Sequence, residues 1–430
     1  MTQRDRTHDP VRRSWVASAN GHRDFPIQNL PFAVVRDGNA DVLAVAIGDE
    51  ALLLNRAIAT GWGADLAPAV RDALRVGPLN AFAQCPPATW TAVRRALSDA
   101  LSDDAHATAL RPALAPITSL EFLLPFHVGD YTDFYASMHH ASNVGAMFRP
   151  DNPLLPNYKW VPIGYHGRAS SIVVSGTPVR RPTGQIKPPD AADPIMAPTR
   201  SLDYELELAL FLGGHNAIGS TVPIASAGER LFGICLLNDW SARDVQSWEY
   251  QPLGPFLAKN FASTISPWVV TSDALIPFRV AMPARPEGDP APLPYLTLAD
   301  DTTFSIELEV SLATRKMRDE QAQPVTLSHV QYATAMYWTP AQLIAHHGSN
   351  GCNLSAGDLL GTGTISGAAA ESRGCLLELT RRGAEPLQLP DGEFRGFLAD
   401  GDEVTFRGRC EAPGTVAIGL GQCRGVIAPA

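Results

Sequence analysis

The sequence predicts a mainly β protein of the α+β class with more than one domain. Runs rich in β-branched or alternating residues recur over most of the chain, which is typical of short strands. Glycine and proline are abundant, at 35 and 36 of 430 residues, and this favours turns over long helices. A chain of this length can fill two or three hydrophobic cores.

The N-terminal third divides into three parts. Residues 1–24 are polar, mix Asp with Arg and lack the apolar middle of a signal peptide, so we expect a disordered or extended arm. Short apolar runs over 41–49 and 52–54 predict a small β unit, and apolar residues at helical spacing predict a helix over 90–105. Because 111–125 is punctuated by proline, it is the best linker candidate. We therefore expect an N-terminal domain over 25–124 and a larger domain over 125–430.

The larger domain is predicted to consist mostly of strands. The strand patterns cover 172–174, 204–212, 231–237, 305–312, 376–379 and 403–406. Helical patterns are fewer and cover 133–144, 241–250 and 327–346.

Composition excludes several classes of protein. Charged residues make up 18% and hydrophobic residues 45%, which argues against disorder. The formal net charge of −10 gives no basic footprint for nucleic acid, and no apolar run is long enough to span a bilayer. The six cysteines are scattered without a CxxC pair, so we expect reduced, buried thiols in a cytoplasmic protein, and no zinc site built on them.

Two glutamates suggest a metal site. Glu205 and Glu207 lie in a predicted strand, where residues i and i+2 share one face about 7 Å apart. Carboxylates this close, in a segment that is otherwise apolar, need a cation or a basic partner. Glu307 and Glu309 repeat the pattern, but nothing nearby in the sequence completes a site, so we interpret that pair as a solvated sheet face.

A second group of polar residues follows the next predicted strand. Asp239 ends this strand, and Lys259 follows twenty residues later. On a helix, Arg243, Gln246 and Tyr250 share one face. Asp239 could complete a divalent-metal site with the two glutamates. Alternatively, Asp239 caps the helix and Arg243 forms an ordinary ion pair.

A third group contains an acid and an imidazole. If 133–144 is helical, Asp133 and His140 share one face and His139 points away. Such a pair could serve as metal ligand and general base, although a core histidine that only hydrogen-bonds its neighbours is the usual alternative. His346 and His347 lack a carboxylate cluster in the sequence around them. The glycine-rich stretch 360–367 lacks the lysine of a P-loop.

Seven motifs resemble those of the fumarylacetoacetate hydrolase family, in order, from about Phe25 to the C-terminus. They are Asp130 to Tyr135, Gly164 to Arg168, Val173 to Pro178, Asn238 to Asp244, Pro252 to Leu257, Asn350 to Leu354 and Gly363 to Gly367. The resemblance implies an SH3-like β-barrel as the N-terminal domain, a mixed β-sandwich roll as the catalytic domain, and a homodimer. It also implies hydrolysis of 4-fumarylacetoacetate to fumarate and acetoacetate, the last step of tyrosine and phenylalanine degradation.

The resemblance also assigns site residues. It implies a metal bound by Asp133, Glu205, Glu207 and Asp239, and His140 as the base that activates water, oriented by Glu378. It further implies that the oxyanion and the departing carbanion are stabilised by Arg243, Gln246 and Lys259. The implied substrate contacts are Tyr135, Arg149, Tyr165, Tyr250 and Thr364. Four carboxylates favour a hard cation, Mg²⁺ or Ca²⁺. The sequence lacks a G-x-S-x-G elbow, which disfavours a covalent acyl-enzyme.

Two other functions remain open at this point. One is a related metal enzyme of the same superfamily that hydrolyses acylpyruvates or decarboxylates a β-keto acid. Because smaller relatives generally lack the N-terminal module, the full N-terminal domain expected here argues against it, as does the expected helix that carries Asp133 and His140. The other is a non-catalytic β-rich binding module that retains an inert metal site.

Overall fold

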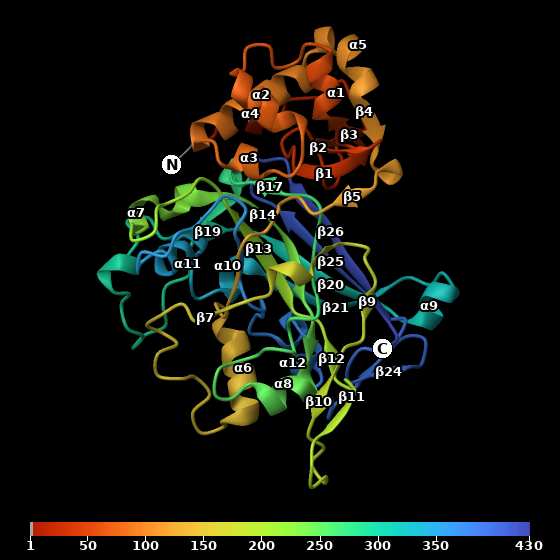
Figure 1. Cartoon of the computed structure of the whole chain (residues 1–430), viewed down its shortest axis with the longest axis vertical. Helices are drawn as coiled ribbons and strands as arrows, with labels where there is room; N and C mark the ends of the chain where they lie inside the picture. Colours follow the sequence, from red (N-terminus) through yellow and green to blue (C-terminus); the bar gives the residue numbers. More distant parts are fainter. Residues whose placement is uncertain (1–2) are drawn as a thin grey trace.

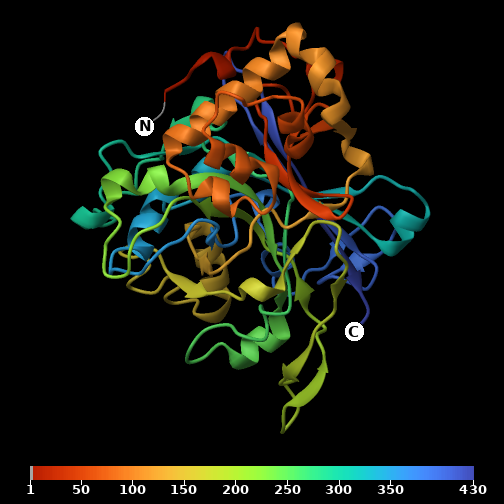
Figure 2. The same ribbon diagram turned by 45° about the horizontal axis from the view of Figure 1, so that its top comes forward.

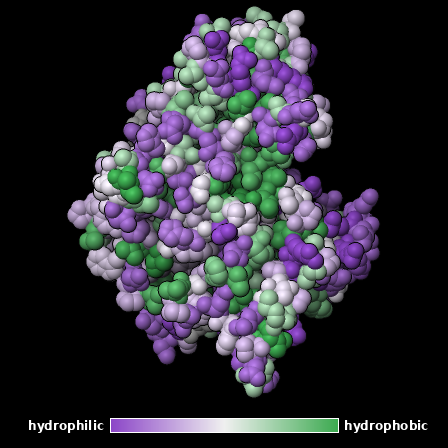
Figure 3. All heavy atoms as spheres, in the orientation of Figure 1, coloured by the Kyte–Doolittle hydropathy of each residue, from purple (hydrophilic) through white to green (hydrophobic). Residues whose placement is uncertain are grey.

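The computed structural model describes residues 3–430 as two packed units. The N-terminal unit lies at one end of the long axis, and the hairpin of β10 (Thr183–Ile186) and β11 (Ile195–Pro198) projects from the opposite end in both ribbon views (Figure 1, Figure 2). The face seen in Figure 3 is largely polar, most uniformly around α9 (Arg315–Asp319). None of the described helices combines the length and the apolar character needed to cross a membrane.

The N-terminal unit is an antiparallel five-stranded sheet, in the order β4-β3-β2-β1-β5, covered by short helices. Its strands are β1 (Phe32–Asp37), β2 (Ala40–Ile47), β3 (Glu50–Leu53), β4 (Leu114–Pro116) and β5 (Phe122–Leu123). Its helices are α1 (Leu54–Ala59), α2 (Pro68–Arg75), α3 (Asn80–Ala83), α4 (Pro87–Ser102) and α5 (Ala107–Leu110). The helix expected over 90–105 is α4, which begins three residues earlier because Pro87 suits the first helical position. The segment 111–125, expected as a linker, instead supplies both edge strands of this sheet.

The N-terminal arm differs from the expected disordered or extended segment. Residues 3–24 form two 3₁₀ turns, Arg6–His8 and Ala17–Ala19, and lie along α4. Ser14 Oγ donates to the Leu101 carbonyl at 2.7 Å, and Trp15 Nε1 donates to the Ala100 carbonyl at 2.9 Å. Polar side chains that suggested disorder thus form specific hydrogen bonds with α4. The arm is ordered by these tertiary contacts, which its own sequence does not reveal.

The C-terminal unit stacks two sheets face to face. The first is eight-stranded and mixed, in the order β7-β6-β22-β13-β14-β16-β8 with β17 added to β14; the second has the order β21-β20-β25-β26-β9. The first sheet comprises β6 (Tyr131–Phe134), β7 (Gly164–His166), β8 (Ile172–Val174), β13 (Leu206–Leu212), β14 (Leu231–Asp239), β16 (Ser263–Ile265), β17 (Val270–Thr271) and β22 (Leu359–Gly361). The second comprises β9 (Val179–Arg180), β20 (Glu307–Ala313), β21 (Val325–Gln331), β25 (Glu403–Cys410) and β26 (Ile418–Ala428).

Smaller elements surround this sandwich. The two-stranded sheets pair β10 (Thr183–Ile186) with β11 (Ile195–Pro198), β12 (Leu202–Asp203) with β15 (Ser241–Ala242), β18 (Arg279–Ala281) with β19 (Thr302–Phe304), and β23 (Leu387–Gln388) with β24 (Phe394–Arg395). The helices are α6 (Met138–Phe148), α7 (Ile224–Ala227), α8 (Arg243–Glu249), α9, α10 (Tyr332–Ala335), α11 (Pro340–His347) and α12 (Leu376–Leu379).

Strand β13 contributes side chains to two hydrophobic cores, one on each face of the first sheet. Leu206, Leu208 and Leu210 pack into the core between the two sheets, whereas the alternate residues Ala209 and Phe211 pack into a core shared with the N-terminal unit. Side chains alternate across a strand, so β13 is buried on both faces. The strand therefore has little freedom to shift its register, and the glutamates near its N-terminal end are held in place.

The seam between the units is aromatic, and Trp90 on α4 is central to it. Its ring lies edge-on to Phe232 of β14 at 5.1 Å between centroids, and Nε1 donates to the Phe82 carbonyl at 3.1 Å. We expect Trp90→Ala to lower the free energy of unfolding by about 3–5 kcal/mol, because the cavity cannot close between two rigid units. Thermal or urea unfolding would measure this. Trp160→Ala, at a tryptophan that is 43% exposed, is the control and should change stability far less; an equal loss in both would contradict a packed seam.

Three expected elements of the larger domain are wrong in type. Residues 133–144 are not one helix: Asp133 lies in β6, and α6 begins at Met138, where the Ser137 hydroxyl accepts a bond from the His140 amide. Residues 327–331 belong to β21, paired with β20, so that the expected helix over 327–346 is helical only in α10 and from Pro340 onward in α11. Residues 376–379 form the helix α12 and not a strand, and the Asp203 carboxylate accepts hydrogen bonds from its first two amides.

Candidate active site

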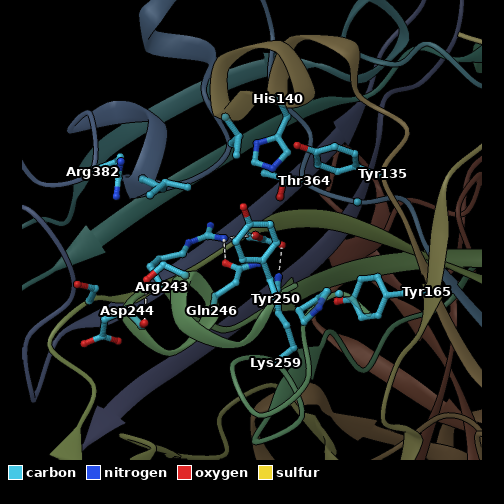
Figure 4. Close-up of a pocket in the computed structure, with 18 of the residues that line it drawn as sticks. Tyr135, His140, Tyr165, Arg243, Asp244, Gln246, Tyr250, Lys259, Thr364 and Arg382 are labelled. Atoms are coloured by element: carbon cyan, nitrogen blue, oxygen red, sulfur yellow. Dashed lines mark hydrogen bonds and ion pairs between the residues drawn. The ribbon is translucent and has the colours of Figure 1, made fainter. Parts of the chain in front are cut away.

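A cavity of about 900 Å³ opens beside the C-terminal unit's first sheet. It gathers side chains from β6, α6, β7, α8 and the loops after them (Figure 4). The predicted site residues that line it are Asp133, Tyr135, His140, Arg149, Tyr165, Glu205, Arg243, Gln246, Tyr250, Lys259 and Thr364. The other predicted residues, Glu207, Asp239 and Glu378, lie behind this lining and are buried.

Three carboxylates from separate strands meet beneath the cavity. Asp133 on β6, Glu207 on β13 and Asp239 on β14 each place an oxygen so that all three lie within 4.8 Å of one another. Strand β22 runs between β6 and β13, and its Gly361 makes the approach possible. A Cβ there would lie 2.6 Å from Asp133 Oδ1 and 3.0 Å from Glu207 Oε2. Glu307 and Glu309, the decoy pair with the same sequence pattern, lie on a solvated sheet face as expected, since Glu307 is exposed and Glu309 is partly so.

The electrostatics of this cluster call for a cation. Burial and the neighbouring carboxylates raise the pKa of Asp133 to about 7 and hold the pKa of Glu207 well above its usual range. Burial also raises the pKa of Asp239, although Lys259 opposes it. A charge of opposite sign among the three would reverse the repulsion that causes these shifts.

Glu205 occupies a different position from the other three acids. Arg243 Nη1 donates to its Oε1 at 2.6 Å and Lys259 Nζ donates to its Oε2 at 2.5 Å. Burial alone would raise its pKa, but these two cations outweigh burial and hold the pKa of Glu205 below its usual range. Lys259 Nζ also donates to Asp239 Oδ2 at 2.9 Å, so it joins Glu205 to the carboxylate cluster. The alternative of an ordinary ion pair at Arg243 therefore describes only part of its contacts.

His140 and Glu378 form a buried dyad on one side of the cavity. His140 Nδ1 lies 2.6 Å from Glu378 Oε2. Burial by itself raises the pKa of Glu378, but the attraction of His140 and the surrounding hydrogen bonds outweigh it and lower the pKa to about 2. An ionised carboxylate accepts hydrogen bonds only, so the shared proton belongs to Nδ1 and Nε2 is left as the basic nitrogen. Figure 4 shows the imidazole directed into the cavity, near Thr364 and Tyr135.

The remaining predicted residues surround the same space. Tyr165 donates to Asp239 Oδ2 at 3.2 Å, and the Tyr135 ring lies edge-on to His140. Arg243 Nη1 also donates to Gln246 Oε1 at 3.1 Å, which leaves the Gln246 amide nitrogen for a ligand. Arg149 lies at the exposed edge and donates to the Pro153 carbonyl. Tyr250 and Thr364 also line the cavity (Figure 4).

Comparison with known proteins agrees with the motifs. The family model described as fumarylacetoacetate (FAA) hydrolase C-terminal matches residues 130–428, and fumarylacetoacetase N-terminal matches 28–125. The chain belongs to the fumarylacetoacetate hydrolase family. Fumarylacetoacetases from Caenorhabditis elegans and Homo sapiens are 48% and 47% identical to it, each over 95% of this chain and 97% of the relative. Maleylpyruvate hydrolase from Sphingobium sp. SYK-6 shares the fold, with a TM-score of 0.50 at 15% identity over 93% of this chain and 100% of that one.

The carboxylate cluster fits the divalent metal of the fumarylacetoacetate hydrolase family. Asp133 Oδ1 and Glu207 Oε1 are buried without a hydrogen-bond partner among the described residues. Buried carboxylate oxygens are costly unless a donor or a cation meets them. The ligand atoms are all oxygens, the type that hard cations prefer.

The sequence did not reveal four polar residues that hydrogen-bond to predicted site residues in the structure. Ser366 Oγ, Cys375 Sγ and Asn143 Nδ2 donate to Glu378, at 2.7, 3.2 and 2.7 Å. Asp203 is wholly buried and accepts from Arg243. The spacing Asp203, Glu205, Glu207 could have revealed it, because the pattern of alternate acids begins one step earlier. His140, Cys375 and Glu378 also have ligand atoms within 4.8 Å of one another, but their mutual hydrogen bonds account for that geometry.

Proposed function

We propose that this protein is a metal-dependent hydrolase that splits 4-fumarylacetoacetate with water into fumarate and acetoacetate, the last step of tyrosine and phenylalanine degradation. The observation that carries the proposal is that an imidazole–carboxylate dyad and a buried acidic cluster border the same cavity. Near-complete coverage by fumarylacetoacetases at 47–48% identity supports the same substrate.

His140 acts as the base. Its Nε2 takes a proton from water, and the resulting hydroxide oxygen bonds to the substrate carbonyl carbon, whose π electrons move to the carbonyl oxygen. Glu378 keeps the Nδ1 proton in place and stabilises the imidazolium that forms. An electron pair on the oxyanion then re-forms the carbonyl, the carbon–carbon bond breaks, and the electron pair of that bond goes to the departing enolate. The proton held on Nε2 is then available to neutralise this product.

Arg243, Gln246 and Lys259 stabilise the negative oxygens. Arg243 Nη2 is buried without a hydrogen-bond partner among the described residues, although Nε and Nη1 are bonded to acids. A donor held in place by two bonds, with a third N–H group left over, is preorganised for an oxyanion. Because these donors are fixed before the substrate binds, the charge that develops meets little reorganisation cost.

Asp133, Glu207 and Asp239 would hold the metal, with Glu205 as the fourth predicted ligand beside them. A bound Mg²⁺ or Ca²⁺ would supply a Lewis acid that polarises substrate oxygen. The substrate carries two carboxylates, and Tyr135, Arg149, Tyr165, Tyr250 and Thr364 are our proposed contacts for them and for the chain between them. Planar guanidinium groups such as Arg149 suit carboxylates.

Removing the divalent cation is expected to abolish turnover and to lower the melting temperature, because repulsion among the buried carboxylates is then uncompensated. The measurement is activity and thermal unfolding after dialysis against a chelator, followed by titration with Mg²⁺ or Ca²⁺. Glu207→Gln should remove the rise in melting temperature on adding metal. Glu309→Gln, in the decoy pair with the same sequence pattern, should leave it intact; metal-independent activity would contradict the prediction.

The proposed substrate is tested by comparing kcat/KM for fumarylacetoacetate and acetylpyruvate. We expect preference for the former. The opposite preference would indicate the acylpyruvate hydrolase, release of CO₂ from a β-keto acid would indicate the decarboxylase, and no turnover of any of these would indicate the binding module.

The wider organisation of the protein is also proposed. The five-stranded sheet supports an SH3-like barrel within an N-terminal domain over 25–124, followed by the catalytic domain over 125–430. The six unpaired cysteines support a cytoplasmic protein, where thiols stay reduced. We also propose a homodimer. Exposed apolar side chains such as Leu253 and Phe256 could be covered in it, and light scattering would measure the mass.

A further inference from the structure

Asp203 is a buried carboxylate that joins two parts of the site. It lies in β12, its side chain is wholly buried, and it does not line the cavity. Arg243 Nε donates to its Oδ2 at 2.9 Å. The backbone amides of Leu376 and Leu377 donate to its Oδ1 and Oδ2, at 2.8 and 2.9 Å. One side chain therefore contacts both the oxyanion donor and the start of α12.

The contact with α12 bears on Glu378, which this helix carries. Helix α12 has only four residues, and the side chain of its N-cap residue, Cys375, makes no capping bond. The first amides of a helix need acceptors from elsewhere. Asp203 supplies them from a strand 173 residues away in sequence, and it thereby turns 376–379 into a helix where the residue pattern predicts a strand. The direction in which Glu378 faces His140 depends on this turn.

The contact with Arg243 sets the plane of the guanidinium. Arg243 donates through Nε to Asp203 and through Nη1 to Glu205, so two carboxylates together fix the plane of the guanidinium. Nη2 remains as the donor without a partner among the described residues. Without the carboxylate of Asp203, the guanidinium would be held only through Nη1, by Glu205 and Gln246, and it could rotate about that one nitrogen.

We propose that Asp203 is a positioning residue that fixes the separation between the base dyad and the oxyanion donor. It acts through Arg243 and Glu378 and touches no substrate. The inference rests on the proposed function, since it assigns roles to those two residues. Small displacements are costly in catalysis, because a shift of about 1 Å can lower the rate about 100-fold.

A buried Asp–Arg pair could also be present for stability alone, and the chain contains a matched control. Asp402 is equally buried, accepts from Arg395 Nε and Nη2 at 2.8 and 2.9 Å, and accepts from the Ala399 amide at 2.8 Å. Neither Asp402 nor Arg395 lines the cavity. Asp203→Asn and Asp402→Asn therefore remove the same kind of charge from the same kind of pair.

The experiment compares both variants in the full-length protein with bound Mg²⁺. We expect similar losses of melting temperature, but a kcat about 100-fold lower only in Asp203→Asn, with KM changed less than about threefold. The double variant Asp203→Asn, Glu378→Gln should show a smaller fold-loss of kcat than the product of the two single fold-losses, because both substitutions act on one dyad. Equal kcat losses in the two Asp→Asn variants would overturn the proposal. A double variant whose fold-loss of kcat equals the product of the single fold-losses would also overturn it.

Two further measurements keep the result interpretable. Asp203→Glu retains the charge and shifts it by one methylene, so it should fold even if Asp203→Asn does not, with kcat lowered at least about tenfold; wild-type kcat would overturn the proposal. Hydrogen exchange at residues 376–379 needs no substrate. It should quicken in the Asp203 variants and not in Asp402→Asn, and unchanged exchange would also overturn the proposal. An inactive wild-type protein would refute the proposed function alone.

Discussion

Replacing His140 with alanine is expected to lower kcat by about 10²–10⁴-fold, the usual contribution of a positioned general base. No other imidazole lines the described part of the cavity, so nothing replaces it at the attacking water. Glu378 keeps its bonds from Ser366, Cys375 and Asn143, and the fold should therefore persist. Steady-state kinetics with circular dichroism would measure both.

Two observations make this result specific to the base. His139 precedes it on α6 and does not line the cavity, so His139→Ala should retain activity within about threefold. The carboxylate cluster does not include His140, so calorimetry should find metal affinity unchanged in His140→Ala. Unchanged turnover in this variant would remove His140 from the mechanism and leave the dyad a structural hydrogen bond.

Replacing Lys259 with methionine is expected to damage both stability and rate. Its ammonium group is the cation between Glu205 and Asp239, at 2.5 and 2.9 Å. Removing one partner from a buried charge network costs about 3–5 kcal/mol, because the acids left behind stay desolvated. Losing an oxyanion donor costs a further factor of about 10²–10³ in kcat. Urea unfolding and single-turnover kinetics would separate the two effects.

Lys316 on α9 is the control for this substitution, because it lies on an exposed helix remote from the cavity. Lys316→Met changes the net charge by the same amount and should leave kcat unchanged. A Lys259→Met protein as stable as wild type would mean that Glu205 and Asp239 are neutral in the folded state. In that case the acidic cluster would not require a cation of any kind.

Patterns of side chains predicted the strands that carry the acids. Alternating leucines and acids in β13, and the apolar run of β14 that ends at Asp239, are local features that burial on a sheet requires. The same spacing placed Glu205 and Glu207 on one face, but it did not separate their roles. Glu207 on β13 joins Asp133 of β6 and Asp239 of β14, whereas Glu205, one residue before β13 begins, pairs with Arg243 of α8 and with Lys259.

The helix and strand errors near the site have one physical cause. Asp133 and His140 were expected two turns apart on one helix, but they lie on a strand and on a helix that each contribute to the lining of the cavity. Residues 376–379 have the apolar pattern of a strand, and the energy that makes them helical comes from a carboxylate distant in sequence. Short segments have weak intrinsic preferences, so tertiary hydrogen bonds decide them.

The sequence by itself determined the family, the sheet-rich architecture and the set of polar residues that the fold gathers at one cavity, because motif identity and strand periodicity are local. Only the tertiary structure decided which acids lie close together, how the N-terminal arm is bound to α4, and that Asp203 connects Arg243 to the helix of Glu378. These are contacts between segments far apart in the chain, and their energies depend on burial and distance, which no local pattern encodes.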